Sequence, residues 1–282
     1  MASKPSIAIV GPGRLGSSLA ETLVKTAYPL REIIFRNAKK HAYDLARNLH
    51  TRAVTLKKAR FDADIIWLCV PDALIESTAL SLKSHTAWKN KIVFHSSGAL
   101  ASDALHVLRE RGASVASVHP LMTFVHGSRP ALKGVPFGLE GDQIAVRAAR
   151  QIIKSLGANA FLVRKQDKAL YHAWGTFLSP LALAFMVTAE QLACAIGIAA
   201  KDARQKMFLI AMQTLTNYVN LGPSRSFSGP LVRGDTAIVR EHLTALRRIP
   251  EARETYIVLV KSALRHLPVR NRKKLEKLLR GK

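Results

Sequence analysis

Apolar and polar residues follow one another along the first half of the chain in short blocks that predict strands and helices in turn. Apolar runs of strand type occur at Ile7–Val10, Ile33–Phe35, Ala53–Leu56, Asp64–Val70, Lys91–His95 and Ser114–Val118. Apolar residues at helical spacing fill most of the intervals, over Leu15–Lys25, Lys39–Asn48, Ala73–Leu82 and Ser102–Arg111. Strands that alternate with helices predict a doubly wound α/β domain, in which a parallel sheet is covered on both faces.

The pattern changes after about residue 164. A strand at Pro136–Glu140, a helix at Asp142–Leu156 and a strand at Ala160–Val163 come before the change. Long helical segments follow it, at Lys165–Ile198, Asp202–Leu221, Thr236–Leu246, Glu251–His266 and Val269–Leu279, with Asp202 expected to cap its helix. We therefore expect a Rossmann-type domain over residues 1–163 and an all-α domain over residues 164–282.

A glycine-rich turn follows the first strand directly. Its sequence is Gly11-Pro12-Gly13-Arg14-Leu15-Gly16, which fits G-x-G-x-x-G between a strand and a helix. Gly11 permits the tight turn, Gly13 lets a pyrophosphate approach the backbone, and Gly16 lets helix and strand pack closely. The helix N-terminus then offers free N–H groups to the anion. These six residues are predicted to bind a dinucleotide.

The end of the second strand indicates which dinucleotide is bound. An acidic residue at this place bonds the ribose 2′-hydroxyl of NAD, but here the strand ends in Arg36-Asn37. The forked guanidinium of Arg36 suits a 2′-phosphate. This favours NADP over NAD, although Arg36 as an ordinary loop cation is the alternative.

Composition and charge limit the remaining functions. The 282 residues carry a formal net charge of +24, which would attract phosphorylated cofactors and acidic substrates. No aromatic residue interleaves the C-terminal basic cluster, so a solvated basic surface is favoured over a nucleic-acid partner. The two cysteines are far apart and suggest no metal site. The polar first residues and an interrupted apolar stretch at Trp174–Ala189 favour a cytoplasmic protein without a membrane span.

Several motifs together carry a family resemblance. They are Val70-Pro71-Asp72, His95-Ser96-Ser97-Gly98-Ala99-Leu100, Ser117-Val118-His119-Pro120-Leu121-Met122-Thr123-Phe124, Tyr171-His172-Ala173 and Gly229-Pro230-Leu231-Val232-Arg233-Gly234-Asp235. The chain resembles a bacterial family of Rossmann-like NADP oxidoreductases that carry a C-terminal helical domain of unassigned function. Its wider relatives include pyrroline-5-carboxylate reductases, prephenate dehydrogenases and 6-phosphogluconate and 3-hydroxyacid dehydrogenases. The resemblance implies a 6-phosphogluconate-dehydrogenase-like fold and NADP, with Val70 and Pro71 among the cofactor contacts, but it supplies no substrate.

Ser96 and Ser97 follow the fifth strand, at the edge where ligands bind in open α/β sheets. Their hydroxyls are suited to bonding a substrate oxygen or the nicotinamide amide, and a serine occupies a similar place in prephenate dehydrogenases. The alternative is that serine here caps the next helix, but Ser102 is a better candidate for that cap. Both serines are therefore candidate site residues.

His119 lies just past the sixth strand and before Pro120. It resembles the histidine of a His-Pro pair that handles the substrate hydroxyl in prephenate dehydrogenases. A general base works best with a pKa near 7, which histidine provides without strong tuning. The alternative is a histidine that only fixes its loop by a backbone hydrogen bond.

Lys168 and His172 are one turn apart on the helix that begins near Lys165. A sparse polar stripe on this helix contains Lys168, His172, Thr176, Ser179 and Glu190. Lys168 and His172 resemble a lysine and an asparagine of 3-hydroxyacid dehydrogenases, with histidine in place of asparagine. The stripe is expected to line a cleft; the alternative is an ordinary amphipathic helix of a bundle.

These features predict an NADP-dependent oxidoreductase that transfers hydride between nicotinamide and a small carbonyl, imine or hydroxy compound. Lys168 and Arg233 would pair with an anionic substrate, and His119, or alternatively His172, would transfer the proton. The long apolar helix would form a homodimer. The alternative function is an NADP-binding redox sensor or regulatory protein without turnover.

Overall fold

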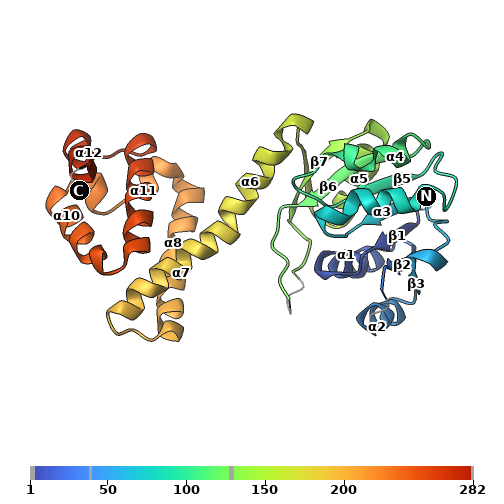
Figure 1. Cartoon of the computed structure of the whole chain (residues 1–282), viewed down its shortest axis with the longest axis horizontal. Coiled ribbons are helices and arrows are strands. Elements are labelled where there is room, and N and C mark those ends of the chain that lie inside the picture. The colour runs from blue at the N-terminus through green and yellow to red at the C-terminus, as the bar shows by residue number, and fades with distance from the viewer. Residues whose placement is uncertain (1–3, 38–39, 127–129, 281–282) are drawn as a thin grey trace. The chain divides into compact units, whose positions relative to one another are not determined.

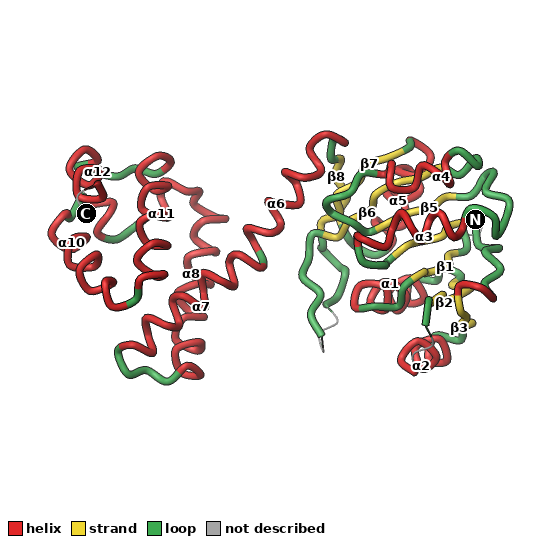
Figure 2. The backbone as a smooth tube through the Cα atoms, in the orientation of Figure 1, coloured by secondary structure: helices red, strands yellow, loops and turns green. Residues whose placement is uncertain are grey.

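The computed structural model describes residues 4–37, 40–126 and 130–280 (Figure 1). The chain divides into two compact units, of which the first ends at Leu178 and the second begins at Ser179. Strands occur only in the first unit among the described residues, and the second consists of helices and loops (Figure 2). The predicted fold class, a Rossmann-like α/β part followed by a helical part, is thereby confirmed.

The first unit is built on one sheet of eight strands. They are β1 (Ile7–Val10), β2 (Leu30–Phe35), β3 (Arg52–Thr55), β4 (Ile65–Leu68), β5 (Ile92–His95), β6 (Ser114–Pro120), β7 (Pro136–Gly141) and β8 (Asn159–Leu162). Their order is β3-β2-β1-β4-β5-β6-β7-β8. The strand order reverses at β1 and β4, and a reversal of this kind creates the crevice in which doubly wound sheets bind ligands.

The sequence predicted a parallel sheet, but the observed sheet is not wholly parallel. β7 runs antiparallel to β6, with His119 opposite Gly138, while the pairs from β1 to β6 are parallel. The described residues between β6 and β7 form no helix. A parallel neighbour needs a crossover connection, usually helical, so a chain that returns through a loop pairs antiparallel instead.

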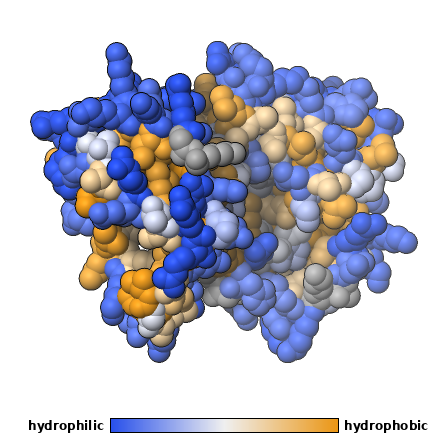
Figure 3. All heavy atoms as spheres, turned by 60° about the vertical axis from the view of Figure 1, so that its left-hand side comes forward, coloured by the Kyte–Doolittle hydropathy of each residue, from blue (hydrophilic) through white to orange (hydrophobic). Residues whose placement is uncertain are grey.

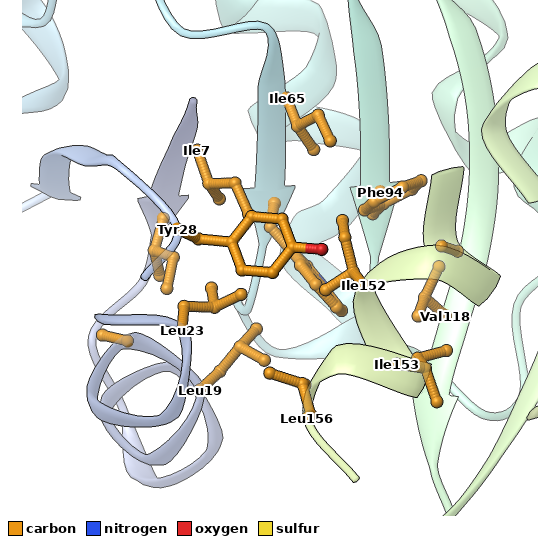
Figure 4. Close-up of a cluster of buried hydrophobic side chains, with 14 of the residues drawn as sticks. Ile7, Leu19, Leu23, Tyr28, Ile65, Phe94, Val118, Ile152, Ile153 and Leu156 are labelled. Carbon is orange, nitrogen blue, oxygen red and sulfur yellow. The ribbon is translucent and has the colours of Figure 1, made fainter. Parts of the chain in front are cut away.

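Helices cover both faces of the sheet. The helices of the first unit are α1 (Arg14–Lys25), α2 (Lys40–Asn48), α3 (Ile75–Leu82), α4 (His106–Arg109), α5 (Gln143–Ser155) and α6 (Lys168–Leu178). The sequence predicted that α2 begins at Lys39, which lies outside the described residues. Leu19 of α1 and Ile152 of α5 pack with Ile7 and Phe94 on one face (Figure 4). Ile75 of α3 lies in the core of the other face. Because successive strand side chains point to opposite faces, strands buried on both faces are apolar throughout.

α6 belongs to the first compact unit. The strand pattern ends at Leu162, close to the predicted boundary after residue 163, but the contacts divide the chain only after Leu178. Tyr171 explains the difference, since its ring is 7% exposed and lies against Gly138 of β7. The residues that α6 contributes can therefore be described together with the sheet.

The helix predicted over Lys165–Ile198 is interrupted. Ser179 has φ −123° and ψ −83°, and α7 (Pro180–Ala195) begins at the next residue. A proline disfavours helical backbone at the residue before it, which accounts for the break at Ser179. The polar stripe predicted along one continuous helix is therefore wrong beyond this residue, and Glu190 pairs instead with Arg204 (Nε–Oε2 2.9 Å).

The second unit contains α7 and five further helices: α8 (Ala200–Ser226), α9 (Pro230–Arg233), α10 (Thr236–Ala245), α11 (Pro250–His266) and α12 (Arg272–Arg280). Gly222, with φ 75°, interrupts α8 where the sequence predicted its end. Asp202 does not cap this helix, because the backbone places the N-cap at Ala199. Val239, Val260 and Leu275 form a small core among α10, α11 and α12.

Large apolar side chains are exposed along α7 and α8. On the face of the molecule seen in Figure 3, hydrophobic residues lie among hydrophilic ones. They include Leu181, Leu183, Phe185, Met186 and Val187 on α7, and Phe208, Leu209, Ile210, Leu215 and Val219 on α8. Among the described residues, one helical stretch, Lys165–Ala195, has the length and composition to cross a membrane. The break at Ser179 divides that stretch into two helices. Lys168 and Tyr171, near the beginning of the stretch, are buried in the protein.

Candidate functional site

The three glycines of the turn after β1 have different roles. Gly11 has φ +95°, and a Cβ there would lie 2.7 Å from the carbonyl oxygen of Cys69. A Cβ on Gly16 would lie 2.2 Å from the carbonyl oxygen of Gly11. These two positions need glycine for the fold itself. At Gly13 an added Cβ would meet no described atom within 4 Å, so that space is left for a ligand.

The N-terminus of α1 suits an anion. Gly13 is its N-cap, and no described side chain forms a capping hydrogen bond there. The first N–H groups of a helix have no partner within the helix and carry partial positive charge. Together with the open space at Gly13, this arrangement fits the pyrophosphate of a dinucleotide.

A pocket of about 530 Å³ extends from this turn. The predicted cofactor contacts that line it are Gly11, Pro12, Gly13, Arg36, Asn37, Val70 and Pro71. Arg14, Leu15, Gly16 and Ser97 are not among its lining residues. No Asp or Glu lines it within the described part of the chain, as expected for a pocket that accepts a 2′-phosphate.

The serines after β5 are held by protein partners. Ser96 Oγ accepts a hydrogen bond from Trp67 Nε1 at 2.8 Å. Ser97 Oγ donates to Asp72 Oδ2 at 2.8 Å and accepts from the backbone N–H of Ala99 and Leu100. The hydroxyl of Ser97 thus stabilises its own turn; it does not cap the next helical turn, whose N-cap is Ala101, as the alternative from the sequence expected.

Ser102 does not cap the next helix. It lies inside a 3₁₀ turn whose N-cap is Ala101. Its hydroxyl donates to Glu140 Oε1 at 2.8 Å and accepts from Arg109 Nη2 at 3.0 Å. The expected cap was wrong because a buried carboxylate from β7 binds this hydroxyl and the Ser102 N–H. Sequence alone gave no sign of that contact.

His95, at the end of β5, fixes the same loop. Its Nδ1 accepts from the Ser97 N–H at 3.1 Å, so its proton is on Nε2, which donates to the carbonyl of Ala101. Burial lowers the pKa of His95 to about 4, against the opposing effect of the Ala101 carbonyl. His95 is therefore a neutral structural residue at neutral pH.

His119 lies near the end of β6 and is half-buried. Its Nδ1 is 2.7 Å from the hydroxyl of Tyr171, and its Nε2 bonds no described residue. Burial, together with the smaller effects of the neighbouring Lys168 and His172, lowers the pKa of His119 to about 3. The expected pKa near 7 without tuning was therefore wrong, and His119 is a neutral imidazole at neutral pH.

Lys168 begins α6 and is 2% exposed. Its Nζ donates to Ser117 Oγ at 2.7 Å and to the carbonyl oxygen of Ser97 at 3.1 Å. Burial lowers the pKa of Lys168 to about 8, opposed by the charges of Glu140 and Asp72. No described carboxylate pairs directly with this ammonium, so it leaves positive charge at the carboxyl edge of the sheet.

His172 meets His119 beside Gly98. The two imidazole rings are 6.3 Å apart between centroids. A Cβ on Gly98 would lie 2.8 Å from His172 Cδ2 and 2.9 Å from His119 Nε2, so this loop position has no space for a side chain. The structure thus brings the predicted residues His119, Lys168 and His172 together at one edge of the sheet.

Tyr171 also lies in this cluster, which we call the carboxyl-edge cluster: His119, Lys168, Tyr171 and His172. In the sequence, Tyr171 stands out only as part of the motif Tyr171-His172-Ala173. Its spacing of three residues from Lys168 could have placed it on the same helix face. By contrast, Arg233, expected to pair with an anionic substrate, pairs with Asp235 (Nε–Oδ2 2.8 Å).

The two depressed histidine pKa values predict an acid-sensitive fold. Between pH 6.5 and about 4, the unfolded chain protonates His95 and His119 while the native protein keeps them neutral. Stability must therefore fall as the pH falls, by up to about 1.4 kcal/mol per pH unit for each histidine. His119→Asn should reduce this dependence in urea unfolding at pH 6.5, 5.5 and 4.5. An unchanged slope in the variant would contradict the neutral state of His119.

Two family models match the sequence. A Rossmann-like domain model matches residues 2–120, and a model described as a domain of unknown function (DUF2520) matches residues 135–263. No match to the sequence is found among curated proteins.

Solved structures share the fold across nearly the whole chain. An NADP oxidoreductase, provisionally so named, from Bacteroides fragilis is 18% identical, with 92% of this chain and 97% of that chain covered and a TM-score of 0.75. Protein TM1727 from Thermotoga maritima is 22% identical, with 96% and 98% covered and a TM-score of 0.73. A reductive aminase from Aspergillus terreus, in complex with NADPH and ethyl-5-oxohexanoate, is 14% identical, with 98% and 99% covered and a TM-score of 0.67.

The fold is shared with these solved structures, among them an NADP oxidoreductase, provisionally so named, and a reductive aminase solved with NADPH. Along the sequence, a match to a Rossmann-like domain is followed by a match to the domain of unknown function DUF2520.

Proposed function

We propose that the protein is an NADP-dependent oxidoreductase that transfers a hydride between nicotinamide and a small, anionic carbonyl, imine or hydroxy compound. The observation that carries this proposal is the carboxyl-edge cluster, which lies at the same edge of the sheet as the glycine turn. Ligands of open α/β sheets bind beyond this edge. The reductive aminase of similar fold, solved with NADPH and an oxo ester, supports this class of reaction.

The residues around the pocket fit a dinucleotide phosphate. The backbone at Gly13 and the N-terminus of α1 would bind the pyrophosphate, and Arg36 would bind the 2′-phosphate. When bound, the reduced nicotinamide supplies the hydride. Gly11 and Gly16 act differently, since they hold the turn in the conformation that creates this site.

The carboxyl-edge cluster would bind the substrate. Among the described residues the buried ammonium of Lys168 bonds neutral oxygens, so its positive charge favours a substrate carboxylate nearby. Nε2 of neutral His119, which bonds no described residue, would form a hydrogen bond with the substrate oxygen or nitrogen at which a proton is exchanged. His172, whose ring faces His119, is the second group able to exchange that proton.

A substrate panel tests the proposal. We expect purified protein to oxidise NADPH in the presence of some members of a set of 2-oxo acids, keto acids and cyclic imines, measured by the loss of nicotinamide absorbance. Matched neutral analogues should react more slowly, because they lack the group that Lys168 attracts. Tight NADPH binding with no turnover on the whole panel would instead favour a redox sensor or regulatory protein.

Arg36→Ala should weaken NADP and leave NAD nearly unchanged, because only NADP carries the 2′-phosphate. A hydrogen bond to a charged group contributes about 1.5–3 kcal/mol, so NADP affinity should fall on the order of 10- to 100-fold. Calorimetric titration of both cofactors measures the effect, and Arg31→Ala, an exposed arginine on the same strand, is the matched control. An equal loss for NAD and NADP would show that Arg36 does not bind the phosphate.

We further propose a homodimer formed through α7 and α8. Their exposed apolar side chains form more apolar surface than a monomer ordinarily leaves in water. Sedimentation at micromolar concentration should give a dimer, and Phe208→Glu with Ile210→Glu should shift it toward the monomer because each buries a charge at the contact. A monomeric wild-type protein would contradict this assembly.

A further inference from the structure

The hydroxyl of Tyr171 joins two neighbouring strands of the sheet. His119 of β6 lies opposite Gly138 of β7 in the antiparallel register. The hydroxyl oxygen is 2.7 Å from His119 Nδ1, and it lies so near Gly138 that a Cβ on that residue would be 2.7 Å from it. Tyr171 therefore contacts both members of one cross-strand pair.

The distances favour the Tyr171 hydroxyl as the donor to His119. The hydroxyl proton has two acceptors in reach, His119 Nδ1 at 2.7 Å and the His119 carbonyl oxygen at 3.4 Å. A separation of 2.7 Å is the most common one for an O–H donor and the short limit for an N–H donor, and 3.4 Å is long for either. When the hydroxyl donates to Nδ1, the ring proton of neutral His119 is on Nε2.

Tyr171 is held firmly enough to impose this arrangement. Its side chain is 7% exposed, and its ring packs edge-on against Phe161 at 5.8 Å. Gly138 provides the space, since a Cβ there would lie 2.7 Å from the Tyr171 hydroxyl oxygen. On the other side of the imidazole, Nε2 faces Gly98 of the loop after β5 and bonds no described residue.

We propose that Tyr171 is a positioning residue that holds His119 in the Nε2–H tautomer and presents this N–H to the substrate beside Gly98. The catalytic consequence rests on the proposed function, but the tautomer itself does not. Burial raises the pKa of Tyr171 to about 12 and lowers that of His119 to about 3. Both groups are therefore neutral over the working pH range, so the hydroxyl keeps its proton and the imidazole keeps one nitrogen able to accept it.

The first test measures the tautomer and needs no substrate. In two-bond ¹H–¹⁵N spectra of protein labelled at its ten histidines, the His119 signals are those lost in His119→Asn. We expect a pyrrole-type Nε2 and a hydrogen-bonded, pyridine-type Nδ1 at pH 7, with the Nδ1 signal shifted in Tyr171→Phe. A proton on Nδ1 in the wild type, or the same Nδ1 signal in a folded Tyr171→Phe protein, would overturn the proposal. The wild-type spectrum decides even if the variant does not fold.

The second test asks whether the arrangement affects turnover. With a substrate from the panel, Tyr171→Phe should lower kcat about 10- to 100-fold and leave the KM for NADPH unchanged, the size of effect seen when a partner that orients a functional histidine is removed. Tyr256→Phe is the matched control, because Tyr256 and His242 form a similar pair at 3.1 Å in the second unit. An unchanged kcat in Tyr171→Phe would overturn the positioning role. Absence of turnover in the wild type would overturn the proposed function and leave the tautomer result intact.

Discussion

Gly13→Val should fold normally and lose affinity for nicotinamide dinucleotides. Gly13 has φ −77° and ψ −160°, which other residues also adopt, and an added Cβ would meet no described atom within 4 Å. The new side chain would instead occupy the space through which a pyrophosphate reaches the N-terminus of α1. Losing two charge-assisted hydrogen bonds would weaken binding on the order of 100- to 10,000-fold.

Fluorescence titration with NADPH, alongside thermal unfolding of the same samples, measures both halves of this expectation. Gly13→Ala is the graded variant and should lose less affinity than Gly13→Val. Gly16→Ala is the contrast: its Cβ would lie 2.2 Å from the carbonyl oxygen of Gly11, so it should destabilise the fold. Unchanged NADPH affinity in a folded Gly13→Val protein would remove the basis for a dinucleotide site at this turn.

His119→Asn should lower turnover far more than it lowers cofactor affinity. Asparagine is polar and of similar size, but it offers no imidazole for proton exchange at the substrate atom. General acid–base groups typically contribute roughly 10²- to 10⁴-fold in rate, and kcat with NADPH and a panel substrate should fall within that range. The dissociation constant for NADPH should change little, because His119 is not among the residues that line the dinucleotide pocket.

His106→Asn is the control for this substitution, since His106 is an exposed histidine on α4 whose Nδ1 bonds the carbonyl oxygen of Asp103. It should turn over like the wild type. If His119→Asn kept full kcat, the proton would have to come from another group, and His172→Asn would then be the variant to measure next.

The sequence predicted the architecture because the inner strands are buried on both faces, while the edge strands β3 and β8 are only partly buried. Continuous apolar runs placed all eight strands, β1 at its observed bounds, and the loss of these runs marked the beginning of the helical part. The direction of β7 and the break at Ser179 were not predicted. β7 runs antiparallel because the connection before it contains no helix among the described residues. The helix breaks at Ser179 because Pro180 disfavours helical backbone at the residue before it.

Part of the candidate site could also be predicted. His119 was found from its place at a strand end, and Lys168 and His172 from their one-turn spacing; the structure brings these three together. The hydroxyl partners could not be predicted. Ser97 and Ser102 bind carboxylates of Asp72 and Glu140, which lie 25 and 38 residues away in the sequence. A serine's hydrogen-bond partner depends on tertiary contacts that a local pattern does not contain.

The register between β6 and β7 has a consequence for how the two matched families are understood. The Rossmann-like model ends at residue 120 and the DUF2520 model begins at residue 135, so the boundary between them separates β6 from β7 within one continuous sheet. His119 falls on one side of that boundary, and Lys168, Tyr171 and His172 fall on the other. A gene fragment cut at this boundary would separate an imidazole from the phenol that bonds it and leave two exposed strand edges. The segment that matches DUF2520 therefore shares both the sheet and the carboxyl-edge cluster with the Rossmann-like segment. Its chemistry has to be assayed in a protein that contains both segments.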